Sequence, residues 1–430
     1  MTPRHPEQMP CLLFANSKGE IQEFPELWMA GRSGRQYLQP ALTDLIPLPE
    51  GSELFVLPDR FPIGIDPEDG LPARLAENPY QAAEGLQAVA AFVAPAHTTI
   101  LTAAFEKKTP EVGPLPLFAY TAVGWHDNQF WVASFRSDQS IRQEASRFDP
   151  KKIKARTLAA LKRHPDNRLI QHLGKCSLTY SCPAAKNFFL GREEAPLPTS
   201  PACNAACIGC ISLQPSGCCP STQDRIKFVP SPAEIAEVAV PHLESVKQAV
   251  VSFGQGCEGE PLLQAETIER AIRLIRRQTS RGTINLNTNA SLPEAVARLA
   301  EAGLDSIRVS MNSARPPAHS LYYRPKGFTF DDVRQSIVEM KKRDRFVSLN
   351  YFICPGVTDS EDETEAFCQL VEEYHPDFIQ LRNLNMDPDW YLEAIRHPEH
   401  SPAWGITQWL AIIKKRFPAL RFGYFNPPLR

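Results

Sequence analysis

From residue 196 onward the chain alternates short β-branched runs with longer amphipathic segments, and this alternation limits the possible folds more than any other feature. Six runs predict strands, at 197–200, 248–253, 283–288, 306–310, 347–353 and 378–381. Five segments between them predict helices, at 232–246, 263–279, 292–302, 330–342 and 361–374. Strands and helices that alternate in this way form a parallel sheet with right-handed crossovers.

Six strand–helix units are too few for a complete eight-fold barrel. We therefore predict an α/β fold, with an open or partial (β/α)6 barrel over residues 196–395 and a C-terminal extension over 396–430. The extension contains one predicted helix, 404–415, and a short aromatic strand, 422–425. Ligands of such barrels bind at the carboxyl ends of the strands, so the residues there are the first candidates for function.

The first 195 residues have a different pattern. Short apolar runs broken by turns predict a β-rich N-terminal domain over 1–135, with a hairpin of 117–125 and 129–135 and one helix near 81–94. Residues 136–195 predict a helical connector that contains Cys176 and Cys182. Its basic stretch, 151–164, favours a solvated helix face over an RNA-binding patch.

The composition is that of an ordinary soluble globular protein, with 43% hydrophobic residues and a formal net charge of -3. This balance gives no general attraction to nucleic acid or to an anionic membrane. No signal peptide is visible at the N-terminus, and no apolar run approaches the length of a membrane span. We therefore expect a cytoplasmic protein with reduced thiols and no membrane partner.

Cysteines are concentrated in one part of the chain. Eight of the 11 lie between Cys176 and Cys257, and in a reducing compartment this indicates metal or redox chemistry rather than disulfides. The sharpest motif is Cys203-Asn-Ala-Ala-Cys207-Ile-Gly-Cys210, on a loop directly after the first predicted strand. Three thiolates can bind three irons of a [4Fe–4S] cube, whose usual complement is four cysteines. The fourth iron then stays open for a small molecule, as at a catalytic metal site.

This loop resembles the signature of the radical S-adenosylmethionine (radical SAM) superfamily, whose members are similar in having the triplet after the first strand of a partial (β/α)6 barrel. The segment Gly254-Gln-Gly256-Cys257-Glu258-Gly259-Glu260-Pro261 resembles the family's GGEP element, with Glu258 in place of the first glycine. Gly209 stands where the family usually has an aromatic residue. The resemblance covers residues 196–390.

The resemblance implies an enzyme that reductively cleaves S-adenosylmethionine at a [4Fe–4S] cluster bound by Cys203, Cys207 and Cys210. The resulting 5′-deoxyadenosyl radical would abstract hydrogen from a substrate that the sequence does not identify. A low-potential electron donor, ferredoxin or flavodoxin, is implied as partner. The strand-end residues expected at the cofactor are Gly256, Gly259, Glu260, Asn287, Asn289, Ser310 and Asn312, with Ile353 and Val357 packing on adenine.

Each of these interpretations has an alternative. The triplet could bind structural zinc, or hold a non-catalytic cluster that transfers electrons or senses redox state. Short polar residues at strand ends also cap strands and helices. The Tyr322-Tyr323 pair could be a substrate loop or an aromatic anchor, and Arg382 and Asn383 could bind an anionic substrate or make structural contacts.

The other cysteines of this region allow a second iron–sulfur cluster, or they are buried as small hydrophobic residues. They are Cys176, Cys182, Cys218, Cys219 and Cys257. Cys257 is also a candidate catalytic thiol, because it adjoins the expected cofactor pocket. His172 lies close to Cys176 in the sequence, although a structural role is commoner for such a histidine.

Overall fold

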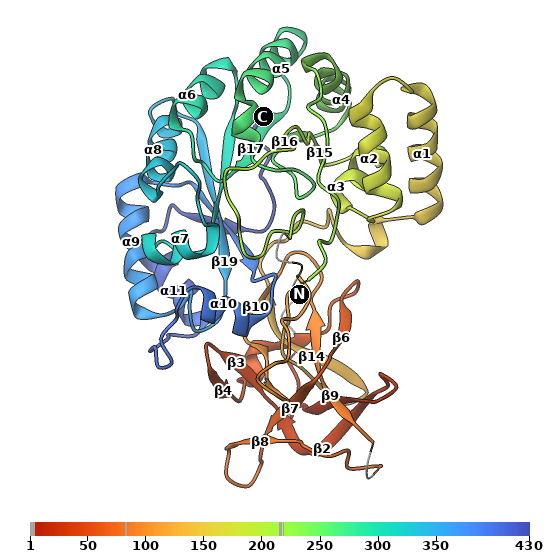
Figure 1. The fold of residues 1–430 in the computed structure, drawn as a ribbon, viewed down its shortest axis with the longest axis vertical. Helices are drawn as coiled ribbons and strands as arrows, with labels where there is room; N and C mark the ends of the chain where they lie inside the picture. The colour runs from red at the N-terminus through yellow and green to blue at the C-terminus, as the bar shows by residue number, and fades with distance from the viewer. Residues whose placement is uncertain (1–4, 82–83, 215–216, 218) are drawn as a thin grey trace. The chain divides into compact units, whose positions relative to one another are not determined.

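The computed structural model describes residues 5–81, 84–214, 217 and 219–430 (Figure 1). Contacts group the chain into two compact units that do not follow chain order. Unit 1 consists of Met1–Gln139, Phe352–Cys368 and Leu381–Pro418, and unit 2 consists of Ser140–Tyr351, Gln369–Gln380 and Ala419–Arg430. The four domains expected from the sequence follow chain order, and that division stays a prediction.

Most of the parallel sheet lies in unit 2. Its seven strands stand in chain order: β15 (Glu194–Pro196), β16 (Val250–Phe253), β17 (Thr283–Thr288), β18 (Ser306–Met311), β19 (Phe346–Ile353), β20 (Phe378–Asn383) and β21 (Arg421–Gly423). Parallel registers join β15 to β16, β16 to β17, β17 to β18, β18 to β19 and β20 to β21. The predicted α/β partial barrel is confirmed, and the strand predicted in the tail joins its sheet as a seventh member.

The first strand is the one that the sequence misplaces. It ends at Pro196, whereas the prediction began at Leu197. Leu197 still donates its backbone N–H to the Ser252 carbonyl, but Thr199 and Ser200 donate theirs to the Glu258 carboxylate. A side chain therefore takes the place of a strand neighbour over these residues.

Helices follow the strands as predicted, and α4, α5, α6 and α8 pack side by side along the sheet (Figure 1). A capping box of Ser231 and Glu234 begins α4, and Gly303, with φ of 116°, ends α6. The helices are α4 (Pro232–Ser245), η3 (Pro261–Gln264), α5 (Ala265–Gln278), α6 (Pro293–Ala302), α7 (Pro316–Tyr323), α8 (Phe330–Lys341) and α9 (Glu361–Tyr374). The sequence did not predict α7.

Three helices form the connector, α1 (Pro150–Arg163), α2 (Arg168–Leu178) and α3 (Pro183–Leu190), preceded by η2 (Ala145–Arg147). They pack on one another, α2 also contacts α4, and α3 contacts β15 (Figure 1). Helix α1 buries Ile153 and Thr157 and exposes most of its basic residues, as expected for a solvated face.

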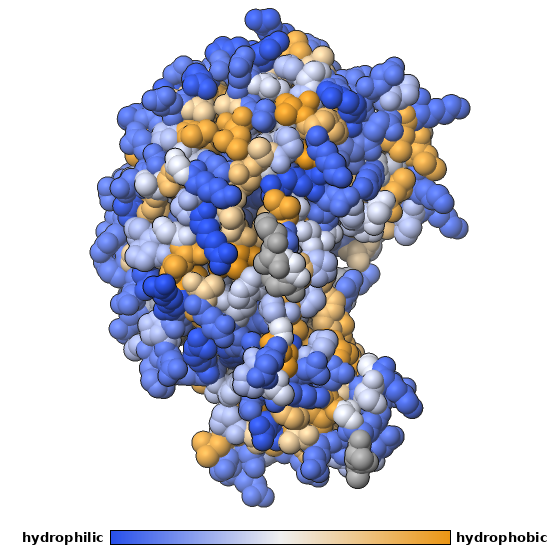
Figure 2. All heavy atoms as spheres, in the orientation of Figure 1, coloured by the Kyte–Doolittle hydropathy of each residue, from blue (hydrophilic) through white to orange (hydrophobic). Residues whose placement is uncertain are grey.

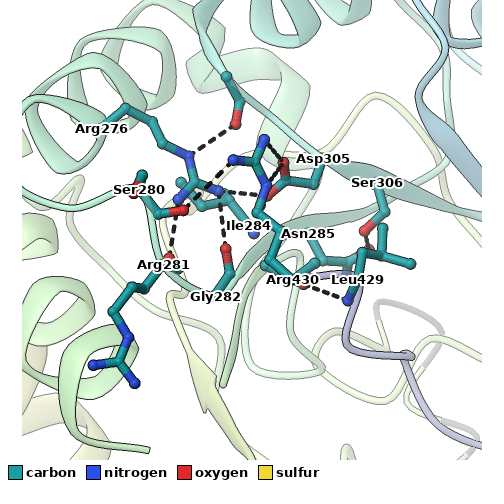
Figure 3. Close-up of polar contacts among 12 residues, drawn as sticks. Arg276, Ser280, Arg281, Gly282, Ile284, Asn285, Asp305, Ser306, Leu429 and Arg430 are labelled. Atoms are coloured by element: carbon teal, nitrogen blue, oxygen red, sulfur yellow. Dashed lines mark hydrogen bonds and ion pairs between the residues drawn. The ribbon is translucent and has the colours of Figure 1, made fainter. Parts of the chain in front are cut away.

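The chain end is fixed to the amino ends of β17 and β18 (Figure 3). Asp305, whose side chain is 4% exposed, accepts hydrogen bonds from the Ile284 backbone and from the guanidinium groups of Arg276 and Arg430. Leu429 donates its backbone N–H to the Thr283 hydroxyl at 2.7 Å. These contacts hold the amino ends of the two strands.

Unit 1 is built mainly from β-strands, in an 11-stranded and a 3-stranded sheet. It also contains η1 (Leu42–Asp44), α10 (Pro388–Ala394) and α11 (Ile406–Arg416). Its strands are β1 (Cys11–Asn16), β2 (Ile21–Met29), β3 (Gly31–Ser33), β4 (Gln36–Leu38), β5 (Leu45–Pro47), β6 (Glu53–Leu57), β7 (Arg60–Ile65), β8 (Pro72–Arg74), β9 (Leu86–Phe92), β10 (His97–Thr99), β11 (Thr102–Ala103), β12 (Phe105–Lys107), β13 (Val123–His126) and β14 (Gln129–Arg136).

One prediction for this region is confirmed and one is wrong. The hairpin exists, since β13 and β14 pair around Asp127 and Asn128, both with positive φ. The helix predicted near 81–94 is instead strand β9, which pairs with β1 and β6. Its small apolar residues are buried on both faces, and periodicity cannot separate such a run from a buried helix.

Segments far apart in sequence meet within unit 1. The Asp387 carboxylate, which is fully buried, accepts from Arg60 and from the Leu115 backbone, both at 2.8 Å.

Hydrophilic residues dominate the face in Figure 2, with apolar residues in small groups between them. Throughout the described ranges, no helix has both the length and the apolar character needed to cross a bilayer.

Candidate functional site: a cysteine triplet at the sheet edge

The triplet loop, residues 203–210, is held on one side by the end of α7. Ala206 donates its backbone N–H to the Tyr323 carbonyl at 2.9 Å, and Ile208 donates to the Tyr322 carbonyl at 3.1 Å. Both tyrosines are buried. Of the two interpretations of this pair, the structure supports the anchor. Cys203, Cys207 and Cys210 are free thiols and partly exposed.

The other side is held by the glycine–glutamate loop, residues 254–260. Gly259 donates to the Ser200 carbonyl at 2.7 Å, and Glu260 donates to the Ala202 carbonyl at 2.8 Å. A Cβ on Gly259 would lie 1.9 Å from the Ala202 oxygen, so glycine is required at this close approach. The glycine–glutamate loop therefore determines where the triplet loop begins.

Both glutamates of this loop point inward and are satisfied by protein donors. Glu258 accepts from the backbone of Thr199, Ser200 and Gln255 at 2.7–2.9 Å. Glu260 accepts from the Thr288 hydroxyl and from the Asn289 backbone. Burial raises the pKa of each carboxyl to about 7, against the lowering effect of these hydrogen bonds. The two side chains thus join the ends of β16 and β17 to the segment that leads into the triplet.

An amide network connects the third strand end to the triplet loop. Asn289 donates to the Asn204 side chain at 2.8 Å, and Asn204 donates to the Ser291 hydroxyl at 2.9 Å. Asn287 donates to the Gly254 carbonyl at 3.0 Å. Sequence reasoning did not select Asn204, although it directly follows Cys203 and so always lies in the loop.

The remaining predicted cofactor residues of unit 2 are Gly256, Ser310 and Asn312. Gly256 is exposed in the glycine–glutamate loop. Ser310 is half-buried near the end of β18, and Asn312 donates to the Ala318 carbonyl at 3.2 Å, in the turn to α7. Their contact with a cofactor stays a prediction.

Four residues that the sequence placed near the cofactor or substrate belong to unit 1, namely Ile353, Val357, Arg382 and Asn383. Ile353 and Val357 are almost fully buried there. Asn383 accepts from the Thr99 backbone at 2.9 Å and donates to the His97 carbonyl at 3.1 Å. The amide of Asn383 is therefore occupied by strand β10, which supports its structural interpretation.

The thiols of the triplet share one electrostatic environment. Burial raises the pKa of Cys203 and raises that of Cys207 further, and the neighbouring thiol of Cys210 adds to both. Arg225 donates to the Cys210 sulfur at 3.5 Å and to the Ser212 hydroxyl at 3.1 Å. A guanidinium thus lies where negative charge on the sulfurs would be stabilised.

A second group of sulfur ligands lies at the connector. His172 Nε2 is 3.6 Å from Cys176 Sγ and 3.5 Å from Cys257 Sγ. The hydrogen bond with Cys257 lowers the pKa of Cys176 to about 5, and the partnership raises the pKa of Cys257 well above its usual value. Cys219 is buried elsewhere, and Cys218 lies outside the described residues.

Residues 197–368 match the sequence model of the Radical SAM superfamily. The GTP 3',8-cyclase of Microcystis aeruginosa (strain NIES-843 / IAM M-2473) is 29% identical over 158 residues, which cover 35% of this chain and 48% of that protein. The FeMo cofactor biosynthesis protein NifB of Klebsiella pneumoniae is 28% identical over 181 residues, 38% of each chain. The chain thus spans less than half of either curated relative.

Among solved structures, the crystal structure of HydG, a maturase of the [FeFe]-hydrogenase, aligns with a TM-score of 0.38 and 16% identity, over 65% of this chain and 67% of that one. The family match is the informative comparison, because it begins just before the triplet loop and extends beyond the glycine–glutamate loop. Residues 197–368 therefore form a radical SAM domain.

Proposed function

We propose that this chain binds a [4Fe–4S] cluster through Cys203, Cys207 and Cys210 and cleaves S-adenosylmethionine reductively. The observation that carries the proposal is a loop with three free, partly exposed thiols, fixed by backbone hydrogen bonds from both sides. When bound and reduced, such a cluster supplies the electron that breaks the carbon–sulfur bond, so that a 5′-deoxyadenosyl radical can abstract hydrogen from a substrate.

The spacing of the thiols fits a cube better than a single ion. Zn–S bonds of about 2.3 Å in a tetrahedron place two sulfurs about 3.8 Å apart. Within the described ranges, only His172, Cys176 and Cys257 form a group of three potential ligand atoms that all lie within 4.8 Å of one another. The triplet sulfurs therefore do not all lie within 4.8 Å of one another, whereas the sulfurs around one tetrahedral zinc ion would. This argues against the zinc alternative at the triplet.

The chain's own residues have separate tasks in this proposal. The Glu258 carboxylate holds Ser200 and the Glu260 backbone N–H holds Ala202, just before Cys203. Asn289 orients the loop through Asn204. Arg225 stabilises negative charge on the Cys210 sulfur, and such hydrogen bonds are one determinant of cluster potential.

The electron source and the substrate are further parts of the proposal. We infer a reducing compartment, the cytoplasm, and a low-potential ferredoxin or flavodoxin as donor. The two curated relatives are named for different reactions, so they give no common substrate for this chain. Peptide side chains and small cofactor precursors stay open as substrate classes, and the small net charge of -3 disfavours large RNA.

Anaerobic reconstitution of the full chain tests this function. We expect 5′-deoxyadenosine when dithionite and S-adenosylmethionine are added, and no product from a Cys203→Ala/Cys207→Ala/Cys210→Ala variant. Cys11→Ala is the matched control, because Cys11 is also a partly exposed free thiol but lies on β1. A protein with a fully loaded cluster and no 5′-deoxyadenosine would support the electron-transfer or redox-sensing alternative.

A further inference from the structure

A second metal site can be assigned from a cluster of side chains that the proposed function does not use. Helix α2 carries His172 and Cys176 four residues apart, which places both side chains on one face of the helix. Cys257 comes from the glycine–glutamate loop and meets them. Cys176 and Cys257 are 1% and 5% exposed, so water has little access to either sulfur.

The distances match the edges of one coordination tetrahedron. Zn–S bonds are about 2.3 Å long and Zn–N bonds about 2.0–2.1 Å. In a tetrahedron, a sulfur and a nitrogen bound to the same ion therefore lie about 3.6 Å apart. The observed separations from His172 Nε2 are 3.6 Å to Cys176 Sγ and 3.5 Å to Cys257 Sγ. All three ligand atoms lie within 4.8 Å of one another. Ligands on different irons of a cube would stand further apart, so this group suits a single ion.

Cys182 supplies a candidate for the fourth position. Cys182 packs against the cluster that Cys176, Ala185 and Cys257 form. Its backbone N–H donates to the Cys176 carbonyl at 3.0 Å, which holds the two residues together. Cys182 is the N-cap of α3, but its side chain makes no capping hydrogen bond. The Cys182 sulfur lies outside the group of three ligand atoms that are all within 4.8 Å of one another, so its side chain must turn toward them to complete the site.

We propose that His172, Cys176, Cys182 and Cys257 form a closed tetrahedral site for one thiophilic divalent ion of the zinc class. Three sulfurs and one imidazole nitrogen are a common set for structural zinc, and four protein ligands leave no open position for a substrate. The site is structural and gives Cys257 a role other than that of a catalytic thiol.

The position of the site indicates what the ion stabilises. It joins α2 and the start of α3 to the glycine–glutamate loop, where the next residue, Glu258, holds Thr199 and Ser200. The Cys257 carbonyl also accepts from the Ile226 backbone at 2.7 Å. The bound ion therefore connects the helical connector to the backbone that leads into the triplet.

The test is metal analysis of the full chain, purified without oxygen and incubated with zinc or with cobalt alone. We expect one zinc per chain in the wild type and also in the Cys203→Ala/Cys207→Ala/Cys210→Ala variant, which separates this inference from the proposed function. Bound Co(II) should give the visible bands of tetrahedral thiolate ligation. Cys182→Ser should keep a tetrahedral spectrum with weaker thiolate-to-cobalt absorption.

Substitution of the ligands gives the complementary result. We expect His172→Ala and Cys176→Ser/Cys257→Ser to lower zinc affinity by at least about 100-fold. Cys368→Ser is the control, because Cys368 is a buried cysteine of unit 1. If a ligand variant does not fold, chelator treatment of the wild type replaces it, and loss of zinc should lower the melting temperature. The inference is overturned if the triplet-free variant takes up several irons with sulfide, or if the wild type binds no zinc.

Discussion

Gly259→Ala is the substitution whose effect follows most directly from the geometry of the site. Gly259 lies where the glycine–glutamate loop touches the segment before Cys203, and a Cβ there would be 1.9 Å from the Ala202 carbonyl oxygen. Real Cβ contacts are essentially never shorter than 3.0 Å. The two segments must therefore separate by more than about 1 Å, since backbone atoms on both sides meet.

This separation breaks two hydrogen bonds. The Gly259 N–H to Ser200 carbonyl distance is 2.7 Å and the Glu260 N–H to Ala202 carbonyl distance is 2.8 Å, and neither survives an increase of 1 Å. The N–H groups of Gly259 and Glu260 are left without a partner, and each costs about 1–3 kcal/mol. We expect Gly259→Ala to lower the free energy of unfolding by about 2–6 kcal/mol and to reduce the iron bound after reconstitution.

Urea denaturation of the metal-free chain measures the first effect, and iron and sulfide analysis measures the second. Gly85→Ala is the matched control, because nothing lies within 4 Å of a Cβ at that glycine. If Gly259→Ala unfolded at the wild-type urea concentration and bound wild-type iron, the close approach of the two loops would be of no consequence and the reasoning would fail.

Three other predictions concern charge. Burial lowers the pKa of His319 from 6.5 to about 4. Between these two pH values His319 is therefore protonated in the unfolded chain and neutral in the folded chain. Stability should fall by up to about 3 kcal/mol as the pH drops from 6.5 to 4, and His319→Phe should remove this part of the fall in pH-dependent urea titrations. Asp305→Ala should cost about 3–5 kcal/mol, because it leaves the largely buried Arg276 without its carboxylate. Arg430→Ala should cost less than about 1 kcal/mol in the same assay, since Arg430 is 41% exposed. Arg225→Gln should make the cluster harder to reduce, seen as a lower midpoint potential in an anaerobic redox titration; an unchanged potential would exclude a role for its hydrogen bond to Cys210.

The sequence predicts elements well where local pattern and tertiary burial agree. Strand β17 was placed correctly at both ends, because its residues are all buried and turn residues bound the run. The β9 region was assigned to a helix, because a short run of small apolar residues fits either state until its neighbours are known. Helix α7 is not predicted at all, and the sequence predicts the connector as helical without giving the bounds of α2 and α3.

At the candidate site, too, the sequence predicts the local features and misses the contacts between distant segments. The spacing of Cys203, Cys207 and Cys210 is local, so the triplet is visible in the sequence. The contact of Arg225 with Cys210 joins irregular segments, and no periodicity encodes it. The pairing of Arg60 with Asp387, 327 residues apart, likewise depends on tertiary folding alone.

Cys257 and Glu258, two adjacent residues of the glycine–glutamate loop, contact different parts of the structure. Cys257 contacts His172 and Cys176, whereas the carboxylate of Glu258 holds Thr199 and Ser200. Because adjacent residues of one loop serve both sites, an ion held by Cys257 and a cluster held by the triplet should be energetically coupled.

Coupling between two binding sites is reciprocal. If zinc at the connector strengthens iron binding at the triplet by some factor, then the loaded cluster must strengthen zinc binding by the same factor. The triplet-free variant should thus keep its one zinc but release it more readily to a chelator than the reconstituted wild type does. Equal zinc affinities in the two proteins would mean that Cys257 and Glu258 act independently, despite being neighbours in the chain.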